Sequence, residues 1–241
     1  MVMDKMTRHF EKELISLKGE VNAMWQLVLS QLQKCKQAYI TDNVELAHEV
    51  VIREKSVNSF ELTIDIGCEN FIALFSPVAM DLRLVISLIK ISTTLERIAD
   101  FADGIARHVI EKNNMAPETM REDLKVESMF DAAIAMLSDS FVALESENTK
   151  ISGKILQRDD EIDKLYQEGR KYLAEYIQKE PEKGQCVLDT FLTLRKIERI
   201  GDHCCNIVEE IVFYIDAKVL KHSKGRKAIA KTENHELETA E

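Results

Sequence analysis

Apolar residues recur at three- and four-residue steps along most of this chain of 241 residues. That period places them on one face of an α-helix, whereas a half-buried strand would alternate at every second residue. The first such stretch covers about residues 5–39, and its apolar face consists of Phe10, Leu14, Leu17, Val21, Met24, Val28, Leu32 and Cys35. The pattern therefore predicts one long amphipathic helix that packs against other helices.

Five further helices are predicted in the same way, and a proline stands at the start of three of them. Proline is favoured at the first position of a helix, because the N–H there has no helical partner. The three prolines of the chain are Pro77, Pro117 and Pro181. The predicted helices cover about residues 44–74, 77–111, 117–144, 149–179 and 181–221.

One six-residue segment occurs twice, once in each half of the chain. Residues 95–100 read LERIAD and residues 197–202 read IERIGD, and five of the twelve positions that begin at these points are identical. Self-similarity of this kind indicates that one structural unit is used twice. Each copy lies in a helix that we expect to begin at a proline, Pro77 in the first half and Pro181 in the second.

These observations predict an all-α fold of two tandem three-helix bundles related by an internal pseudo-twofold repeat. We expect the first repeat in residues 1–113 and the second in residues 114–222. Residues 223–241 are charged and poor in apolar side chains, so a disordered tail is expected there.

Composition excludes several classes of protein. Few glycines (8), few prolines (3) and 6% aromatic residues disfavour a turn-rich β fold, and the net charge of −10 disfavours a nucleic-acid partner. No stretch approaches the roughly 20 apolar residues of a membrane span, and the N-terminus lacks the apolar core of a secretory signal. The five cysteines are interpreted as reduced thiols, which predicts a cytoplasmic protein.

Pairs of acidic residues one helical turn apart are Glu96/Asp100, Asp159/Asp163 and Glu198/Asp202, and Glu54 and Asn58 stand at the place in the first half that matches Asp159 and Asp163. Like charges four residues apart on one helix face repel, so something must neutralise them. Consecutive helices of a bundle lie about 8–10 Å apart, so such pairs can meet across a groove and bind cations. The candidate metal ligands are Glu54, Asn58, Glu96 and Asp100 in the first half and Asp159, Asp163, Glu198 and Asp202 in the second.

The same pairs have a plainer interpretation as solvated helix faces, neutralised by Arg97, Arg199 or other basic neighbours. In a chain with 42 acidic residues such pairs are common, and exposed ion pairs contribute little. No nucleophile motif, no glycine-rich phosphate loop and no Glu-x-x-His pair of a di-iron enzyme occurs in the sequence. Catalysis is therefore supported by no motif.

The segment SPVAMDLR at residues 76–83, followed by LERIAD, resembles the first repeat of the PhoU family. Residues 197–203, with 206–207 and 211–214, are similar to the second repeat, so the resemblance covers about residues 5–222. PhoU proteins regulate bacterial phosphate uptake and consist of two three-helix bundles. The resemblance implies a non-enzymatic adaptor that keeps high-affinity phosphate uptake and the phosphate-starvation response switched off when phosphate is plentiful.

The resemblance also implies a chemistry for the carboxylates. Proteins of the family carry E(D)-x-x-x-D motifs that can hold multinuclear iron or zinc clusters on the bundle surface. In this chain the motif positions are those of the eight candidate ligands, with Asn58 where the motif has Asp. The loss of one negative ligand predicts that the first-half site is the weaker of the two.

Three partners are implied by the resemblance: the ATPase subunit of the phosphate ABC transporter, a phosphate-sensing membrane histidine kinase, and a second copy of the chain in a homodimer. The candidate contact residues are Asp81, Arg83, Arg97 and Arg199. Asp81 and Arg83 also have a structural explanation, because an Asp near a helix N-terminus is favoured by the helix dipole and Arg83 can pair with it.

Three other functions stay open at this point. They are a metal-dependent enzyme built on the carboxylate clusters, a structural scaffold with solvated acidic pairs, and an accessory subunit of a different phosphate transporter. A metal-dependent enzyme needs an open coordination position and an acid–base residue beside it. Because no phosphate-binding loop is visible, we expect that the chain does not itself sense phosphate.

Overall fold

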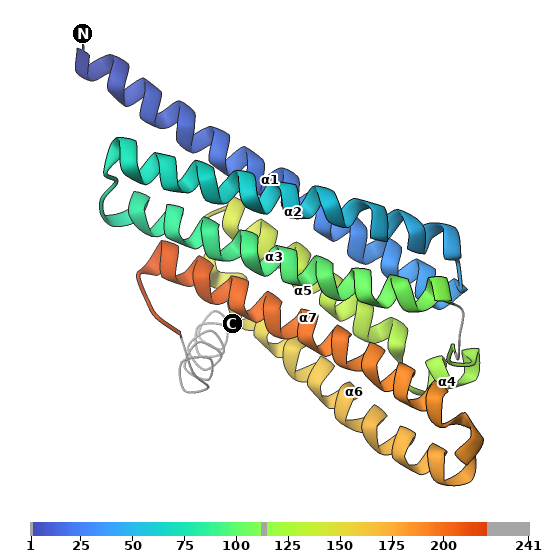
Figure 1. The fold of residues 1–241 in the computed structure, drawn as a ribbon. Coiled ribbons are helices and arrows are strands. Elements are labelled where there is room, and N and C mark those ends of the chain that lie inside the picture. Colours follow the sequence, from blue (N-terminus) through green and yellow to red (C-terminus); the bar gives the residue numbers. More distant parts are fainter. Residues whose placement is uncertain (1, 112–114, 221–241) are drawn as a thin grey trace, which may run out of the picture.

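The structure, a computed structural model, describes residues 2–111 and 115–220, with side chains from residue 6 onward, and every regular element in these ranges is helical (Figure 1). The first bundle consists of α1 (Val2–Thr41), α2 (Val44–Phe75) and α3 (Ala79–Glu111). The second consists of α5 (Val126–Glu145), α6 (Ser152–Lys179) and α7 (Gly184–Asp216). The predicted all-α fold of two tandem three-helix bundles is confirmed. The predicted boundary at 113/114 and the predicted tail at 223–241 lie outside the described residues.

The single helix predicted over residues 117–144 is wrong. The chain forms a short helix α4 (Glu118–Asp123) and then α5, and Lys125 between them has a φ of 51°. A left-handed residue of this kind cannot continue a right-handed helix. Arg121 of α4 donates hydrogen bonds to the carboxylate of Asp42 at 2.6 and 3.0 Å and to the carbonyl of Tyr39 at 2.8 Å. These contacts tie α4 to the end of α1.

Of the three helices predicted to begin at a proline, two begin at a different residue. α3 begins two residues after Pro77, because Ser76 ends α2 in a left-handed conformation and its N–H bonds to the carbonyl of Ile72. Pro117 is the residue before α4 rather than its first residue. Pro181 does open a helical segment, the 3₁₀ turn Pro181–Lys183 that leads into α7, and a similar turn at Thr149–Ile151 precedes α6.

Left-handed residues end or interrupt helices at several places, and none of those in the described residues is a glycine. Ala217, with a φ of 55°, ends α7 at Asp216, five residues before the predicted end near residue 221. The usual signal for a helix end is a glycine in this conformation. The described non-glycine residues with positive φ are Asp42, Ser76, Ala79, Lys125, Glu147 and Ala217.

The two bundles form one body, mainly because α3 packs along α7 and α1 packs against α5 (Figure 1). Near the start of α3, Arg83 donates to the carbonyl of Tyr214 near the end of α7 at 3.2 Å. Further along, Lys196 of α7 donates to the carbonyl of Gly104 of α3 at 2.8 Å. α3 and α7 are therefore antiparallel. A Cβ on Gly104 would lie 2.8 Å from the Lys196 amine, so a larger residue there would displace the end of the Lys196 side chain.

Trp25 of α1 is the largest side chain at the other contact between the bundles. It has no exposed surface, and its indole N–H donates to the carbonyl of Leu137 in α5 at 3.1 Å. Its ring also lies 5.5 Å from that of Phe141. Burial of a ring of this size contributes strongly to stability, so α1 anchors the second bundle as well as the first.

We predict that Trp25→Ala lowers the free energy of unfolding by about 3–5 kcal/mol, because it leaves a cavity between α1 and α5. The matched control is Ile15→Ala on the same helix. The Ile15 side chain is 71% exposed, so this substitution should change the free energy of unfolding by no more than about 0.5 kcal/mol. Urea denaturation followed by circular dichroism measures both. Equal effects of the two substitutions would contradict this assignment of the core.

Candidate metal centre

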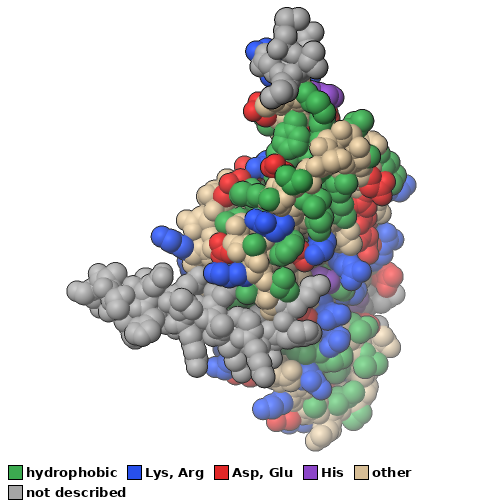
Figure 2. Space-filling view, turned by 90° about the vertical axis from the view of Figure 1, so that its left-hand side faces the viewer, with side chains coloured by type: hydrophobic (Ala, Val, Ile, Leu, Met, Phe, Trp, Pro, Cys, Tyr) green, Lys and Arg blue, Asp and Glu red, His purple; other side chains and the backbone are tan. Residues whose placement is uncertain are grey.

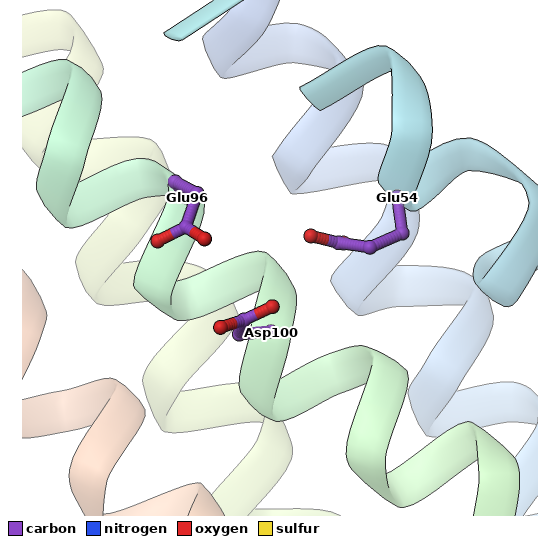
Figure 3. A group of neighbouring side chains, drawn as sticks. All are labelled: Glu54, Glu96 and Asp100. Carbon is purple, nitrogen blue, oxygen red and sulfur yellow. The ribbon is translucent and has the colours of Figure 1, made fainter. Parts of the chain in front are cut away.

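Three carboxylates from two neighbouring helices meet in the first bundle (Figure 3). Glu54 extends from α2 toward α3, where Glu96 and Asp100 stand one turn apart. One oxygen from each of the three side chains lies within 4.8 Å of the others. A single cation between them could therefore contact all three residues after small side-chain movements.

The helical periods of α2 and α3 place these carboxylates. Glu54 falls in the buried row of α2 between Val50 and Val57, and only 8% of its surface is exposed. Glu96 and Asp100 border the buried stripe of α3, where Glu96 is half-buried and Asp100 is exposed. The group is thus closed on the side of the core and open to solvent on the side of Asp100.

Glu54 is held in place from α1 but is only partly satisfied. The fully buried Gln31 donates to one Glu54 carboxylate oxygen at 3.3 Å and to the carbonyl of Val50 at 3.0 Å. The other carboxylate oxygen, Oε1, is buried and has no hydrogen-bond partner. A buried oxygen without a partner is costly, so this position favours a proton or a cation.

The electrostatics of the group point in the same direction. The pKa of Glu54 is raised to about 7, chiefly by burial and further by the nearby charges of Asp100 and Asp103, while the hydrogen bond from Gln31 lowers it. The pKa of Glu96 is also raised, first by burial and then by Asp100. A bound cation would neutralise this repulsion and favour the ionised carboxylates.

Asp103 is an acidic neighbour of this group that the four-residue acidic spacing does not identify. It is 9% exposed, one of its oxygens accepts a hydrogen bond from the Arg107 guanidinium at 2.6 Å, and the other is buried without a hydrogen-bond partner. A search for acidic pairs four residues apart passes over it, because it stands three residues after Asp100. That spacing also lies on one helix face and could have identified it.

The chemistry of this donor set fits a metal ion. All three ligands are carboxylates, which bind hard cations and also Zn²⁺ and non-haem iron. The unpartnered oxygen of Glu54 supplies a coordination position that no protein group satisfies. Glu54, Glu96 and Asp100 are therefore the residues that would hold the metal in this half of the chain.

The second-half carboxylates are arranged more loosely. Asp159 is buried and its Oδ1 lies 3.0 Å from where a Cβ on Gly201 would be, while Asp163 is exposed. Glu198 has one buried oxygen without a hydrogen-bond partner, and burial, Asp202 and Asp163 raise its pKa.

Within residues 6–111 and 115–220, one group of at least three Asp, Glu, His or Cys side chains has ligand atoms that all lie within 4.8 Å of one another. This group is Glu54, Glu96 and Asp100 of the first half. The second-half carboxylates do not reach that proximity. The structure thus gathers the first-half carboxylates more closely, although the missing charge at Asn58, an exposed residue, favours the second half.

The predicted partner-binding residues lie along α3 and α7. The Arg83 guanidinium is engaged by the carbonyl of Tyr214, whereas Arg97 is exposed. The Arg199 guanidinium donates a hydrogen bond to the Asp202 carboxylate at 3.1 Å. This arginine therefore neutralises part of the Glu198/Asp202 pair, as expected if that pair is a solvated helix face. Asp81 lies in the first turn of α3, where the helix dipole favours an acidic residue.

A family model for the PhoU domain matches residues 21–109 and again residues 126–211. The chain belongs to the PhoU family. The two matches contain one copy each of the repeated segment and one set each of the candidate carboxylates. The family resemblance of the sequence is therefore confirmed.

Curated relatives in the PhoU family match along nearly their whole length. The phosphate-specific transport system accessory protein PhoU of Escherichia coli (strain K12) is 33% identical over 216 residues, which cover 90% of this chain and 89% of the relative. The PhoU homolog of Aquifex aeolicus is 30% identical over 211 residues, which cover 88% and 95%.

Two solved structures of PhoU proteins share the fold. The crystal structure of PhoU from Pseudomonas aeruginosa has a TM-score of 0.81 at 29% identity and covers 87% of this chain and 100% of that one. The phosphate transport system regulatory protein PhoU from Streptococcus pneumoniae has a TM-score of 0.78 at 26% identity, with 88% and 100% covered. Within the described residues, no helix has the length and apolar character needed to cross a membrane.

The raised pKa of Glu54 predicts a pH dependence of stability in the metal-free protein. A carboxyl whose folded pKa lies above its usual value binds its proton more tightly in the folded state. Ionisation therefore lowers the free energy of unfolding as the pH rises from about 4.5 to 7. We expect Glu54→Gln to remove this loss and to stabilise the metal-free protein at pH 8 by about 1–3 kcal/mol.

Denaturation midpoints of the wild type and Glu54→Gln between pH 4.5 and 8, measured with a chelator, test this prediction. Glu175→Gln, at an exposed position of α6, is the control and should differ from the wild type by a constant amount. Parallel curves for Glu54→Gln and the wild type would contradict the raised pKa.

Proposed function

We propose that this chain is a regulatory adaptor that represses high-affinity phosphate uptake and the phosphate-starvation response when phosphate is plentiful. The observation that supports it is the match to proteins named phosphate-specific transport system accessory proteins, over about nine-tenths of this chain and of the relatives. The adaptor role is non-enzymatic, as expected for a chain whose sequence contains no catalytic motif.

The proposal includes metal binding by iron or zinc. Glu54, Glu96 and Asp100 support it in the first half, because they combine close oxygens, raised pKa values and a buried oxygen without a partner. A metal there would link α2 to α3 and neutralise the repulsion between them. For the second half we propose a site formed by Asp159, Asp163, Glu198 and Asp202.

The proposed partners are the ATPase subunit of the phosphate ABC transporter and the membrane histidine kinase that senses phosphate, met from the cytoplasm. We also propose a homodimer. Asp81, Arg83, Arg97 and Arg199 remain the proposed contact residues, and the exposed Arg97 is the one most accessible to a partner. Arg83 would have to give up its bond to the Tyr214 carbonyl to act in this way.

The proposal predicts that cells lacking this gene produce alkaline phosphatase even when phosphate is plentiful, and that the wild-type chain restores repression. The triple variant Glu54→Gln/Glu96→Gln/Asp100→Asn should lose the metal of the first-half site and fail to restore repression. The control removes three exposed carboxylates of α6, by Glu161→Gln, Glu168→Gln and Glu175→Gln, and should behave as the wild type.

Alkaline phosphatase activity is measured in the cells, and the metal content of each purified protein is measured by mass spectrometry. Normal repression without the gene would contradict the adaptor role. Full repression by a triple variant that has lost the metal of the first-half site would show that metal binding there is not needed for that role.

A further inference from the structure

α2 carries apolar side chains on its exposed face as well as on its buried face. Leu62, Ile66 and Leu74 are between 50% and 66% exposed. Twelve large apolar side chains are exposed in the described part of the chain, and six of them lie between Ile52 and Met80. Scattered exposed apolar residues are normal, but such a concentration marks an interaction surface.

The position of α2 leaves this face uncovered. α2 packs against α1 and α3 and lies on the side of the first bundle away from α6 (Figure 1). Figure 2 faces the end of the molecule that carries the turn between α2 and α3, and apolar side chains gather there. The exposed residues Leu74, Val78 and Met80 lie in or beside that turn along the chain.

An acidic row follows the apolar residues along the same helix. Glu61, Asp65 and Glu69 stand one turn apart, and residues 56–75 contain these three acids and no Lys, Arg or His. Burial, Glu61 and Glu69 raise the pKa of Asp65, and one of its oxygens is buried without a hydrogen-bond partner. Like charges at this spacing destabilise a helix, so a cationic neighbour would be favourable.

The α2 outer face is defined here by the exposed Leu62, Ile66, Leu74 and Glu69 and by the half-buried Glu61 and Asp65 beside them. We propose that the α2 outer face binds a basic amphipathic helix of a partner protein. Apolar side chains of that helix, at three- and four-residue steps, would cover the leucines and the isoleucine, and its Lys or Arg residues would pair with the acidic row.

Charge distinguishes this occupant from two others. A second copy of the chain, related by a twofold axis, would place the same acidic row against itself and add repulsion. A membrane surface rich in anionic lipids would be repelled by the three carboxylates. A basic amphipathic helix satisfies the apolar and the acidic parts of the α2 outer face together.

The test uses a synthetic peptide of about 18 residues, made of Lys and Leu in amphipathic helical order, and the full chain with a chelator at physiological ionic strength. Calorimetry should show one peptide bound per chain. Leu62→Ser/Ile66→Ser should weaken binding about tenfold or more, because it removes the apolar contacts at the centre of the face. Glu61→Gln/Glu69→Gln should weaken binding and reduce its salt dependence.

The matched control is Leu188→Ser/Leu192→Ser on α7, an apolar pair with the same four-residue spacing and 55% and 52% exposure. It should leave the affinity unchanged, and a peptide with Glu in place of Lys should not bind. An equal loss in the α7 variant, or unchanged affinity in Glu61→Gln/Glu69→Gln, would overturn the proposal. So would a Leu62→Ser/Ile66→Ser variant that dissociates a dimer in light scattering but binds the peptide normally.

Discussion

The antiparallel contact between α3 and α7 is the constraint on which the rest of the structure depends. Both copies of the repeated segment lie in these two helices, and Ile98 and Ile200, at matching places in the copies, are fully buried. Their burial fixes the rotation of each helix about its axis. The acidic residues of each copy are thereby held at the edge of the buried stripe, on the side that faces α2 in the first bundle and α6 in the second.

That geometry explains why carboxylates gather against their mutual repulsion. Glu54 comes from a buried row of α2, so folding brings it toward Glu96 and Asp100 whether or not a cation is present. The hydrophobic burial of both helices outweighs the electrostatic cost, and the cost appears as a raised pKa and an unpartnered oxygen. In the proposed function a metal removes that cost. The α2 outer face is a second place on α2 where acidic side chains stand together with no basic residue nearby in the sequence. There, the Lys or Arg residues of the proposed partner helix would neutralise them.

Much of the fold could be predicted from the sequence, because helical period and internal repeat are carried by many residues at once. The parts that could not be predicted depend on single residues. Lys125 and Ala217 adopt left-handed conformations without being glycine, so the break after α4 and the end of α7 had no sequence signal. In the site, the acidic spacing identified Glu96 and Asp100, and the match between the two halves identified Glu54, and these three carboxylates meet. The support of Glu54 by Gln31 depends on the register of α1 against α2, which no local pattern encodes.

The most direct test of the account is to locate the metal itself. Crystals of the full chain, loaded with iron or zinc, would be measured at the absorption edge of that metal. If these carboxylates form the metal centre, an anomalous peak lies between α2 and α3, at about 2.0–2.2 Å from carboxylate oxygens of Glu54, Glu96 and Asp100. An absence of any peak at that position, in crystals whose metal content is established, would contradict the assignment of this group as a metal centre.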